Sequence, residues 1–372
     1  MATKQTDTKG VSRVTVSEVE GVMDYDALMK EFGVEPFQHY LDKLPNKTAM
    51  YRRGIVFAHR NFERIFKAIN EKRKFAVLTG FNPSGPPHLG NLLFLKQALY
   101  FQQLGAEVFI PISNDETYVF KKQSSLERAT QIAYENVIPD IIALGFKKGK
   151  THIFVSTEYS KVYELAVKLS ARTTFSTIKA IFGFDNETNP GAIFYTVVQA
   201  AHILLPQLKE HGGPRPTVVP IGIDQDPYMR LSRDLAEKLG YVKPSSTYHK
   251  FMPGLQGGKM SGSKPETCIF LNEKPADVRK KIWRAFSGGG ATLQLHKEKG
   301  GNPDVDVACQ YLFFLFEEND KKLFNIFDGY RRGTIFTGEV KELLIKKVNK
   351  FLKEHQKKRE KAKKHIDDFM MR

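Results

Sequence analysis

Three short stretches of the chain, residues 75–78, 108–112 and 218–223, are almost wholly apolar, as is typical of strands buried on both faces of a parallel sheet. Residues 151–156 predict a further strand. Segments with the 3.6-residue periodicity of helices lie between them. This alternation predicts an α/β fold, a Rossmann-like doubly wound parallel sheet with helices on its faces.

The segments after the first two strands contain helix signals of their own. Residues 89–104 place leucines at helical spacing. In residues 124–144, Ser124 and Glu127 stand at the spacing of a capping box, and Pro139 predicts an interruption of the helix. We therefore expect one regular helix after the first strand and a kinked helix after the second.

Changes in pattern divide the chain into three expected parts. Residues 1–73 combine a polar tail with amphipathic segments and predict an N-terminal extension packed on the main body. Residues 74–270 form the predicted Rossmann catalytic domain, with a mostly helical insertion at about 159–213. The aromatic residues of this insertion are expected mainly in the core, with a dimer contact as the alternative. Residues 271–372 lack strand signals and predict an α-helical domain.

The net charge narrows the choice of partner. Lys and Arg number 57 against 41 Asp and Glu, and this surplus of +16 favours a polyanion, with nucleic acid as first candidate. No stretch approaches the roughly 20 apolar residues of a membrane-spanning helix, and the polar first residues lack a signal-peptide core. We expect a cytoplasmic protein with no membrane partner. The two cysteines, Cys268 and Cys309, lack metal-ligand spacing, so no metal site is expected.

Candidate chemistry lies in three segments that follow apolar strands, where open parallel sheets bind ligands. Residues 83–91 combine small side chains with the start of a helix, whose free amides suit a phosphate; a plain turn is the alternative. Residues 222–226 offer carboxylates and an amide for ribose or amino groups, although Asp226 also fits an ordinary helix cap. Residues 257–264 form a glycine-flanked loop whose lysines can stabilise a departing pyrophosphate; an interdomain linker is the alternative.

These segments stand in the order of two known signatures. Residues 88–91 (His-Leu-Gly-Asn) occupy the place of the HIGH signature, and residues 259–263 (Lys-Met-Ser-Gly-Ser) occupy that of KMSKS. The chain thus resembles the class I aminoacyl-tRNA synthetases, and within them the tryptophanyl enzymes of archaeal and eukaryotic type. The narrower resemblance extends from about Val19 to the end and rests on residues 223–228, 233–234, 287–289, 300–303 and 354–356.

This resemblance implies that the chain activates an amino acid to its adenylate and transfers the acyl group to the 3′ end of a tRNA. It implies ATP as substrate, Mg²⁺ on the ATP phosphates, tRNA held by the basic helical domain, and a homodimer. The implied ATP contacts are Ser84, Gly85, His88, Gly90, Asn91, Gly222, Asp224, Lys259 and Met260. The implied catalytic residues are His88, Asn91, Lys259, Ser261 and Ser263. This chain departs from the signatures at Asn91, in place of the last histidine, and at Gly262, in place of the second lysine.

The amino-acid substrate is implied by the whole chain more than by single residues. Known eukaryotic tryptophanyl enzymes hold the indole N–H with a Tyr and a Gln, whose places are taken here by Leu78 and Pro111. The candidate amino-acid contacts are Leu78, Glu116, Tyr118, Gln199 and Gln225. The resemblance as a whole favours L-tryptophan. Three alternatives remain open: tyrosine as substrate, since residues 80–85 resemble archaeal tyrosyl enzymes; a small-molecule nucleotidyltransferase; and an RNA-binding paralogue without ligase activity.

Overall fold

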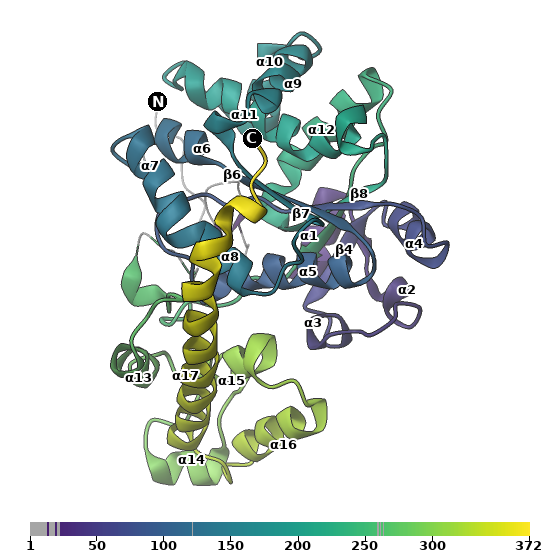
Figure 1. Cartoon of the computed structure of the whole chain (residues 1–372). Helices are drawn as coiled ribbons and strands as arrows, with labels where there is room; N and C mark the ends of the chain where they lie inside the picture. Colours follow the sequence, from purple (N-terminus) through teal and green to yellow (C-terminus); the bar gives the residue numbers. More distant parts are fainter. Residues whose placement is uncertain are drawn as a thin grey trace, which may run out of the picture.

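A seven-stranded sheet forms the centre of the computed structural model, which describes residues 13–14, 19–20, 23–120, 122–258, 260, 262 and 264–372 (Figure 1). The strands lie in the order β3-β4-β9-β8-β5-β6-β7. Their bounds are Glu35–Pro36 (β3), Val56–Arg60 (β4), Ala76–Leu78 (β5), Glu107–Ile112 (β6), Thr151–Val155 (β7), Thr217–Gly222 (β8) and Ser245–His249 (β9). A separate antiparallel pair consists of β1 (Arg13–Val14) and β2 (Val19–Glu20).

The five strands from β9 to β7 run parallel, and the direction of strand addition reverses between β5 and β8. From β5 the chain adds β6 and β7 on one side, and it then returns to add β8 and β9 on the other. The predicted doubly wound sheet is therefore confirmed. Folds of this kind bind their ligands at the carboxyl ends of the strands, where the reversal occurs.

The sheet is larger than the apolar pattern predicted. β9 has the polar sequence Ser-Ser-Thr-Tyr-His, yet all five residues are buried and pair in parallel with β8. Beyond β9, β4 and β3 pair antiparallel. The first 73 residues thus supply two strands of the sheet, in addition to the helices α1 (Tyr25–Phe32), α2 (Gln38–Leu41), α3 (Ala49–Arg52) and α4 (Glu63–Asn70).

Helices cover both faces of the sheet (Figure 1). The helices α5 and α8 pack on the face that presents Val77 and Val108, whereas α9, α11 and α12 pack against Leu78 and Phe109 on the other face. Neighbouring strand residues thus alternate between two apolar clusters, as a pleated strand buried on both sides requires. The helices between β5 and β9 are α5 (Leu92–Gln103), α6 (Asn114–Val119), α7 (Leu126–Ile132), α8 (Ile138–Ala143), α9 (Ser160–Ser170), α10 (Phe175–Phe182), α11 (Pro190–Leu204) and α12 (Asp226–Lys238).

One expected helix cap moves by one residue. The side-chain oxygen of Ser125 accepts a hydrogen bond from the backbone N–H of Arg128 at 3.1 Å and caps α7. The expected capping box at Ser124 is wrong because the extended backbone that a cap requires occurs at the following residue. The interruption near Pro139 is confirmed, since a π-helical turn, Ala133–Val137, joins α7 to α8.

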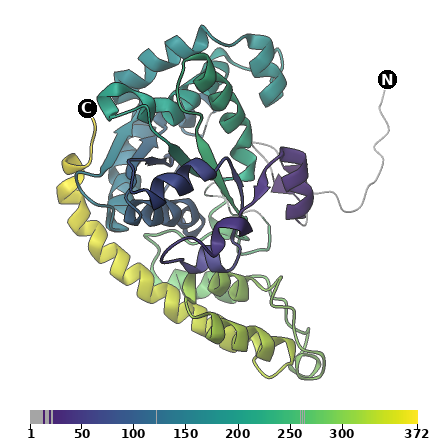
Figure 2. The same cartoon turned by 90° about the vertical axis from the view of Figure 1, so that its right-hand side faces the viewer.

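The predicted helical domain beyond residue 270 is also confirmed. Its longest helix, α17, extends from the tip of this domain back along α8 to the sheet (Figures 1 and 2). The apolar stripe of α17, which includes Leu344 and Val348, is buried in the same cluster as Ile138 and Ile141 of α8, so the two parts share one core. The helices are α13 (Pro275–Trp283), α14 (Leu293–Lys299), α15 (Val307–Tyr311), α16 (Asp320–Arg331) and α17 (Thr337–Ala362). Among the described residues, no helix has the length and apolar character needed to span a membrane.

The two edges of the sheet are covered in different ways. At the β7 edge, the backbone N–H of Met371 donates to the carbonyl of Ile153 at 2.7 Å, and the N–H of Ile153 donates to the carbonyl of Phe369 at 2.8 Å. At the opposite edge, β3 is only two residues long and contains Pro36, which has no N–H to donate. Both edges therefore present few free backbone groups to a neighbouring chain.

Candidate active site

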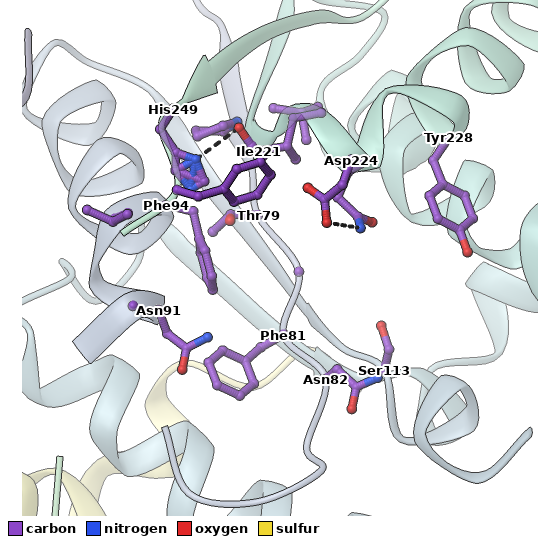
Figure 3. Close-up of a pocket in the computed structure, with 18 of the residues that line it drawn as sticks. Thr79, Phe81, Asn82, Asn91, Phe94, Ser113, Ile221, Asp224, Tyr228 and His249 are labelled. Carbon is purple, nitrogen blue, oxygen red and sulfur yellow. Dashed lines mark hydrogen bonds between the residues drawn. The ribbon is translucent and has the colours of Figure 1, made fainter. Parts of the chain in front are cut away.

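A cavity of about 820 Å³ lies at the carboxyl ends of β5 and β8, where the sheet reverses (Figure 3). It brings together the turn after β5, the turn after β8, helix α11 and the segment after β9. Most of the sequence-predicted site residues line it: Leu78, Ser84, His88, Gly90, Asn91, Glu116, Gln199, Gly222, Asp224, Gln225 and Met260.

Other predicted residues are placed differently. Gly85 and Tyr118 are not among the residues that line the cavity. Tyr118 is 49% exposed because it lies two residues beyond Glu116 on the short helix α6, and residues two apart on a helix face different directions. In the loop that follows β9, Met260 and Gly262 line the cavity. Three predicted residues fall outside the described part of the chain, so their contacts stay predictions: Lys259, Ser261 and Ser263.

The turn between β5 and α5 is closed by its own side chains. The backbone N–H of His88 donates a 2.8 Å hydrogen bond to Oδ1 of Asn91, which fixes the turn from which α5 begins. Asn91 lies at the edge of the cavity at the start of this helix (Figure 3). A Cβ atom at Gly90 would lie 3.0 Å from the sulfur of Met260 and 3.1 Å from the His88 ring, so only glycine permits this close packing.

The His88 side chain is a neutral imidazole at the cavity. Burial lowers the pKa of His88 to about 4, so the ring carries no charge near neutral pH. Its Nδ1 atom is buried and has no hydrogen-bond partner among the described residues. A neutral ring with an unpaired nitrogen, beside the first amides of a helix, can bind an anionic oxygen without bringing a second charge into the site.

The turn after β8 folds a carboxylate back over the end of its own strand. Oδ2 of Asp224 accepts a hydrogen bond from Nε2 of Gln225 at 3.2 Å. A Cβ atom at Gly222 would overlap Oδ1 of Asp224 and would lie 3.0 Å from the Phe251 ring, so a larger residue here would displace the carboxylate. Asp224 faces the cavity from the side opposite Asn91 (Figure 3).

Asp226 has a structural role that differs from the expected helix cap. It is fully buried at the start of α12, and its carboxylate is paired with Arg60 of β4 at 3.0 Å. The hydroxyl of Tyr248 on β9 also donates to this carboxylate. A cap was the wrong interpretation because the partners come from strands that the apolar pattern did not reveal.

Helix α11 carries the polar side chains at the other end of the cavity. The hydroxyl of Tyr195 lies 2.8 Å from Oε1 of Gln199 and 3.1 Å from Oε2 of Glu116. Glu116 is also paired with Lys122 at 2.9 Å. Below them, Nδ1 of His202 lies 3.3 Å from the same Gln199 oxygen, and burial lowers the pKa of His202 to about 3. This network fixes the orientation of Glu116 and Gln199 before any ligand enters.

Sequence reasoning missed several residues that line the cavity, among them Thr79, Ser113, Tyr228, His249 and Phe251. His249 and Phe251 lie at the end of β9, which the apolar pattern could not identify. Burial lowers the pKa of His249 to about 4, and its Nδ1 lies 3.1 Å from the carbonyl of Ile221. Tyr228 lies in the first turn of α12. No group of three or more His, Cys, Asp or Glu in the described part of the chain could hold a metal ion.

The cavity lies at the reversal point of a parallel sheet, where folds of this kind bind their ligands. Residues 70–353 match the family model described as tRNA synthetases class I (W and Y). The chain belongs to this family. As a class I tRNA synthetase, it is 40% identical over 370 residues to the tryptophan–tRNA ligase of Thermococcus onnurineus (strain NA1), covering 96% of this chain and 94% of the relative. It is 41% identical over 367 residues to the ligase of the same name from Sulfolobus acidocaldarius, with coverage of 96% and 94%.

Solved structures of tryptophanyl-tRNA synthetases share the fold of this class I synthetase. The enzyme of the hyperthermophilic archaeon Aeropyrum pernix K1 superposes with a TM-score of 0.88 at 38% identity, covering 94% of this chain and 96% of that one. The enzyme of Encephalitozoon cuniculi, solved bound to tryptophan, superposes with a TM-score of 0.80 at 31% identity, covering 93% and 99%. The resemblance inferred from the two signatures is confirmed.

Proposed function

We propose that the chain is a tryptophan–tRNA ligase, which activates L-tryptophan with ATP and transfers the tryptophanyl group to tRNA(Trp). The observation that supports this most directly is the similarity to ligases of that name, about 40% identity over 96% of the chain. Similarity over this length includes both the cavity and the helical domain. A small-molecule nucleotidyltransferase would not need the second of these parts.

At the nucleotide end, the side-chain amide of Asn91 and the neutral ring of His88 bind the ATP phosphates. Asp224 binds the ribose, and Gly90 leaves room for the adenine. The tryptophan carboxylate is itself the nucleophile toward the α-phosphorus, so the protein contributes mainly positioning and charge stabilisation. Mg²⁺ bound to the ATP phosphates would neutralise part of their charge. By their place in the sequence, Lys259, Ser261 and Ser263 stabilise the departing pyrophosphate.

At the amino-acid end, the carboxylate of Glu116 binds the α-ammonium group of the amino acid. Gln225 contacts the amino acid from the side of the cavity where the nucleotide binds. The indole packs against an apolar wall that includes Leu78, Val219 and Met229, all of which line the cavity. Because Leu78 has no polar atom, the indole N–H must find its acceptor among the polar side chains on α11 and α12. Gln199 is the residue there that the sequence already indicated.

The remaining assignments concern the parts outside the cavity. Residues 341–372 contain 12 Lys or Arg against 5 Asp or Glu, and we assign this basic helical part to the tRNA anticodon stem. We propose a homodimer that forms through the 159–213 insertion, and we place the protein in the cytoplasm.

The test is amino-acid-dependent exchange between ATP and pyrophosphate, with tryptophan, tyrosine and phenylalanine offered separately to the full-length protein. Exchange with tryptophan alone is the expected result. Exchange with tyrosine alone would replace the substrate and keep the mechanism. If none of the three supports exchange, the assay is repeated with tRNA present; continued absence of exchange would favour an RNA-binding paralogue over a ligase.

A further inference from the structure

Residues 268–273, here called the connector, join the loop beside the cavity to helix α13. One side of the connector is hydrogen-bonded to the signature turn at the start of α5. The N–H of Leu89 donates to the carbonyl of Ile269 at 3.0 Å, and the N–H of Leu271 donates to the carbonyl of Pro87 at 2.8 Å. The signature histidine lies between these two hydrogen bonds, so the connector determines the position of its backbone.

The other side of the connector is held by two residues of the C-terminal domain. Nζ of Lys281 on α13 lies 3.0 Å from the carbonyl oxygen of Cys268 at the start of the connector, and Gln356 on α17 holds its far end. Nε2 of Gln356 on α17 lies 3.1 Å from the carbonyl oxygen of Leu271 and 3.1 Å from that of Glu273. A primary amide has two N–H groups, so one side chain can serve both carbonyls. Leu271 is fully buried, and the loss of this donor would leave its carbonyl without a protein partner.

The same turn of α17 is fixed to the catalytic part through the buried carboxylate of Asp140. Nε2 of His355 lies 2.9 Å from Oδ1 of Asp140 on α8, and Nε of Arg359 lies 3.0 Å from the same oxygen. Pro139 has no N–H to offer the carbonyl of Glu135, and that carbonyl instead accepts from the Arg359 guanidinium. Gln356 therefore stands on a helical turn whose place against α8 is defined, and from there it reaches the connector.

We propose that Gln356 is a positioning residue for amino-acid activation. Its side chain holds the connector in a fixed position relative to α17, and the connector in turn holds the signature turn. This inference rests on the proposed function, which gives the signature turn its role in ATP binding. Since α17 belongs to the basic part assigned to tRNA, a shift of this helix on tRNA binding moves the connector and, with it, the phosphate-binding turn. A hydrogen-bonded route through the side chain of Gln356 and the connector thus links the tRNA-binding part to the ATP site.

The first test compares three full-length variants in the pyrophosphate-exchange assay. Gln356→Met keeps the side-chain length and removes both donors, whereas Gln356→Lys restores donors that can reach the carbonyls. Gln294→Met is the matched control, because it makes the same chemical change at an exposed position of α14 in the same domain.

We expect Gln356→Met to raise the KM for ATP by roughly tenfold, the effect of about one lost net hydrogen bond, and to change the KM for tryptophan less than about twofold. Gln356→Lys should recover most of the loss, and Gln294→Met should behave as the parent protein. A merely structural role would lower the active fraction, so that kcat falls while both KM values stay the same. That result, or an unchanged KM for ATP, would overturn the proposal.

The second test measures amide hydrogen exchange in the full chain without substrates, so it remains valid even if tryptophan is not the substrate. In Gln356→Met, the amides of Leu89 and Leu271 should exchange about tenfold faster, while amides of the distant strand β7 keep their protection. Faster exchange throughout the chain would indicate general destabilisation and contradict the proposal. If Gln356→Met does not fold, Gln356→Asn, which keeps the amide but shortens its reach, is measured in the same way.

Discussion

The backbone N–H of His88 and the side-chain oxygen of Asn91 are joined by a 2.8 Å hydrogen bond, so the residue that departs from the family signature also shapes the turn that presents it. The oxygen of the Asn91 amide is thereby occupied, and the nitrogen is the group left for a ligand. An asparagine at this position can close the turn and still donate to a phosphate.

Replacing Asn91 with Asp separates these two roles. The variant keeps the oxygen that accepts from His88, but it loses the amide donor and adds a negative charge where the phosphates are proposed to bind. We expect pyrophosphate exchange to fall by about 100-fold or more, with little change in the free energy of unfolding. Steady-state exchange and urea denaturation measure the two quantities. A variant with full activity would show that Asn91 makes no contact with the phosphates.

Substitution of Gly222 by Ala tests the turn after β8. The new methyl group would overlap Oδ1 of Asp224 and press on the ring of Phe251, so the carboxylate must turn away. We expect a destabilisation of about 1–3 kcal/mol and a raised KM for ATP. Gly338→Ala is the control, because its methyl group would meet only Trp283 at an ordinary contact distance of 3.6 Å. Unchanged ATP binding in the first variant would remove Asp224 from the nucleotide site.

The buried His202 predicts a specific dependence of stability on pH. Its pKa is about 3 in the folded chain and 6.5 in the reference state, so the unfolded chain binds the proton first and stability falls as pH drops below 6.5. Between pH 6.5 and 5 this residue alone removes about 2 kcal/mol.

Urea denaturation of His202→Gln against the parent protein at pH 7, 6 and 5 isolates that contribution. The stability difference between the two proteins should shrink by about 2 kcal/mol across this range. Burial raises the pKa of Asp115 to about 6, which acts in the opposite direction, but its effect is common to both proteins and cancels. A constant difference would mean that His202 is charged in the folded state.

Exposed aromatic residues on the insertion and on α6 predict the dimer surface. Phe175 and Phe194 are 49% and 38% exposed on α10 and α11, and Phe120 beside α6 is 37% exposed. Covering them in a second copy would bury apolar area that is otherwise in contact with water. We expect Phe194→Asp to convert the dimer to a monomer in sedimentation velocity, whereas Phe324→Asp, on the exposed surface of α16, leaves it intact. A parent protein that sediments as a monomer would exclude this surface.

The sequence predicted the parts of the fold where burial requires apolar residues on consecutive positions. β5, β6 and β8 lie at the centre of the sheet and contain such runs, whereas β7 forms one edge. β9 is equally buried, but its polar side chains find partners inside the protein: Thr247 donates to Gln97 at 3.0 Å, and Ser246 to Tyr248 at 2.7 Å. A polar strand satisfied in this way leaves no hydrophobic signal.

The candidate site shows the same division. Residues in the signature segments, such as His88 and Asp224, could be named because their order along the chain is distinctive. His249 could not, because it depends on a strand that was not recognised. Tyr118 is a polar candidate from the sequence, but the helical rotation that separates its direction from that of Glu116 could not be predicted, since α6 is too short to show a period.

The pairing of Ile153 with Phe369 and Met371 has a practical consequence for handling this protein. These residues shield the last strand of the sheet, and trimming them would leave a free strand edge able to recruit other copies. Proteolytic loss of four terminal residues would then cause precipitation without any change in the cavity. Affinity tags for purification belong at the opposite terminus, and mass spectrometry of aggregated material is the quickest check for such trimming.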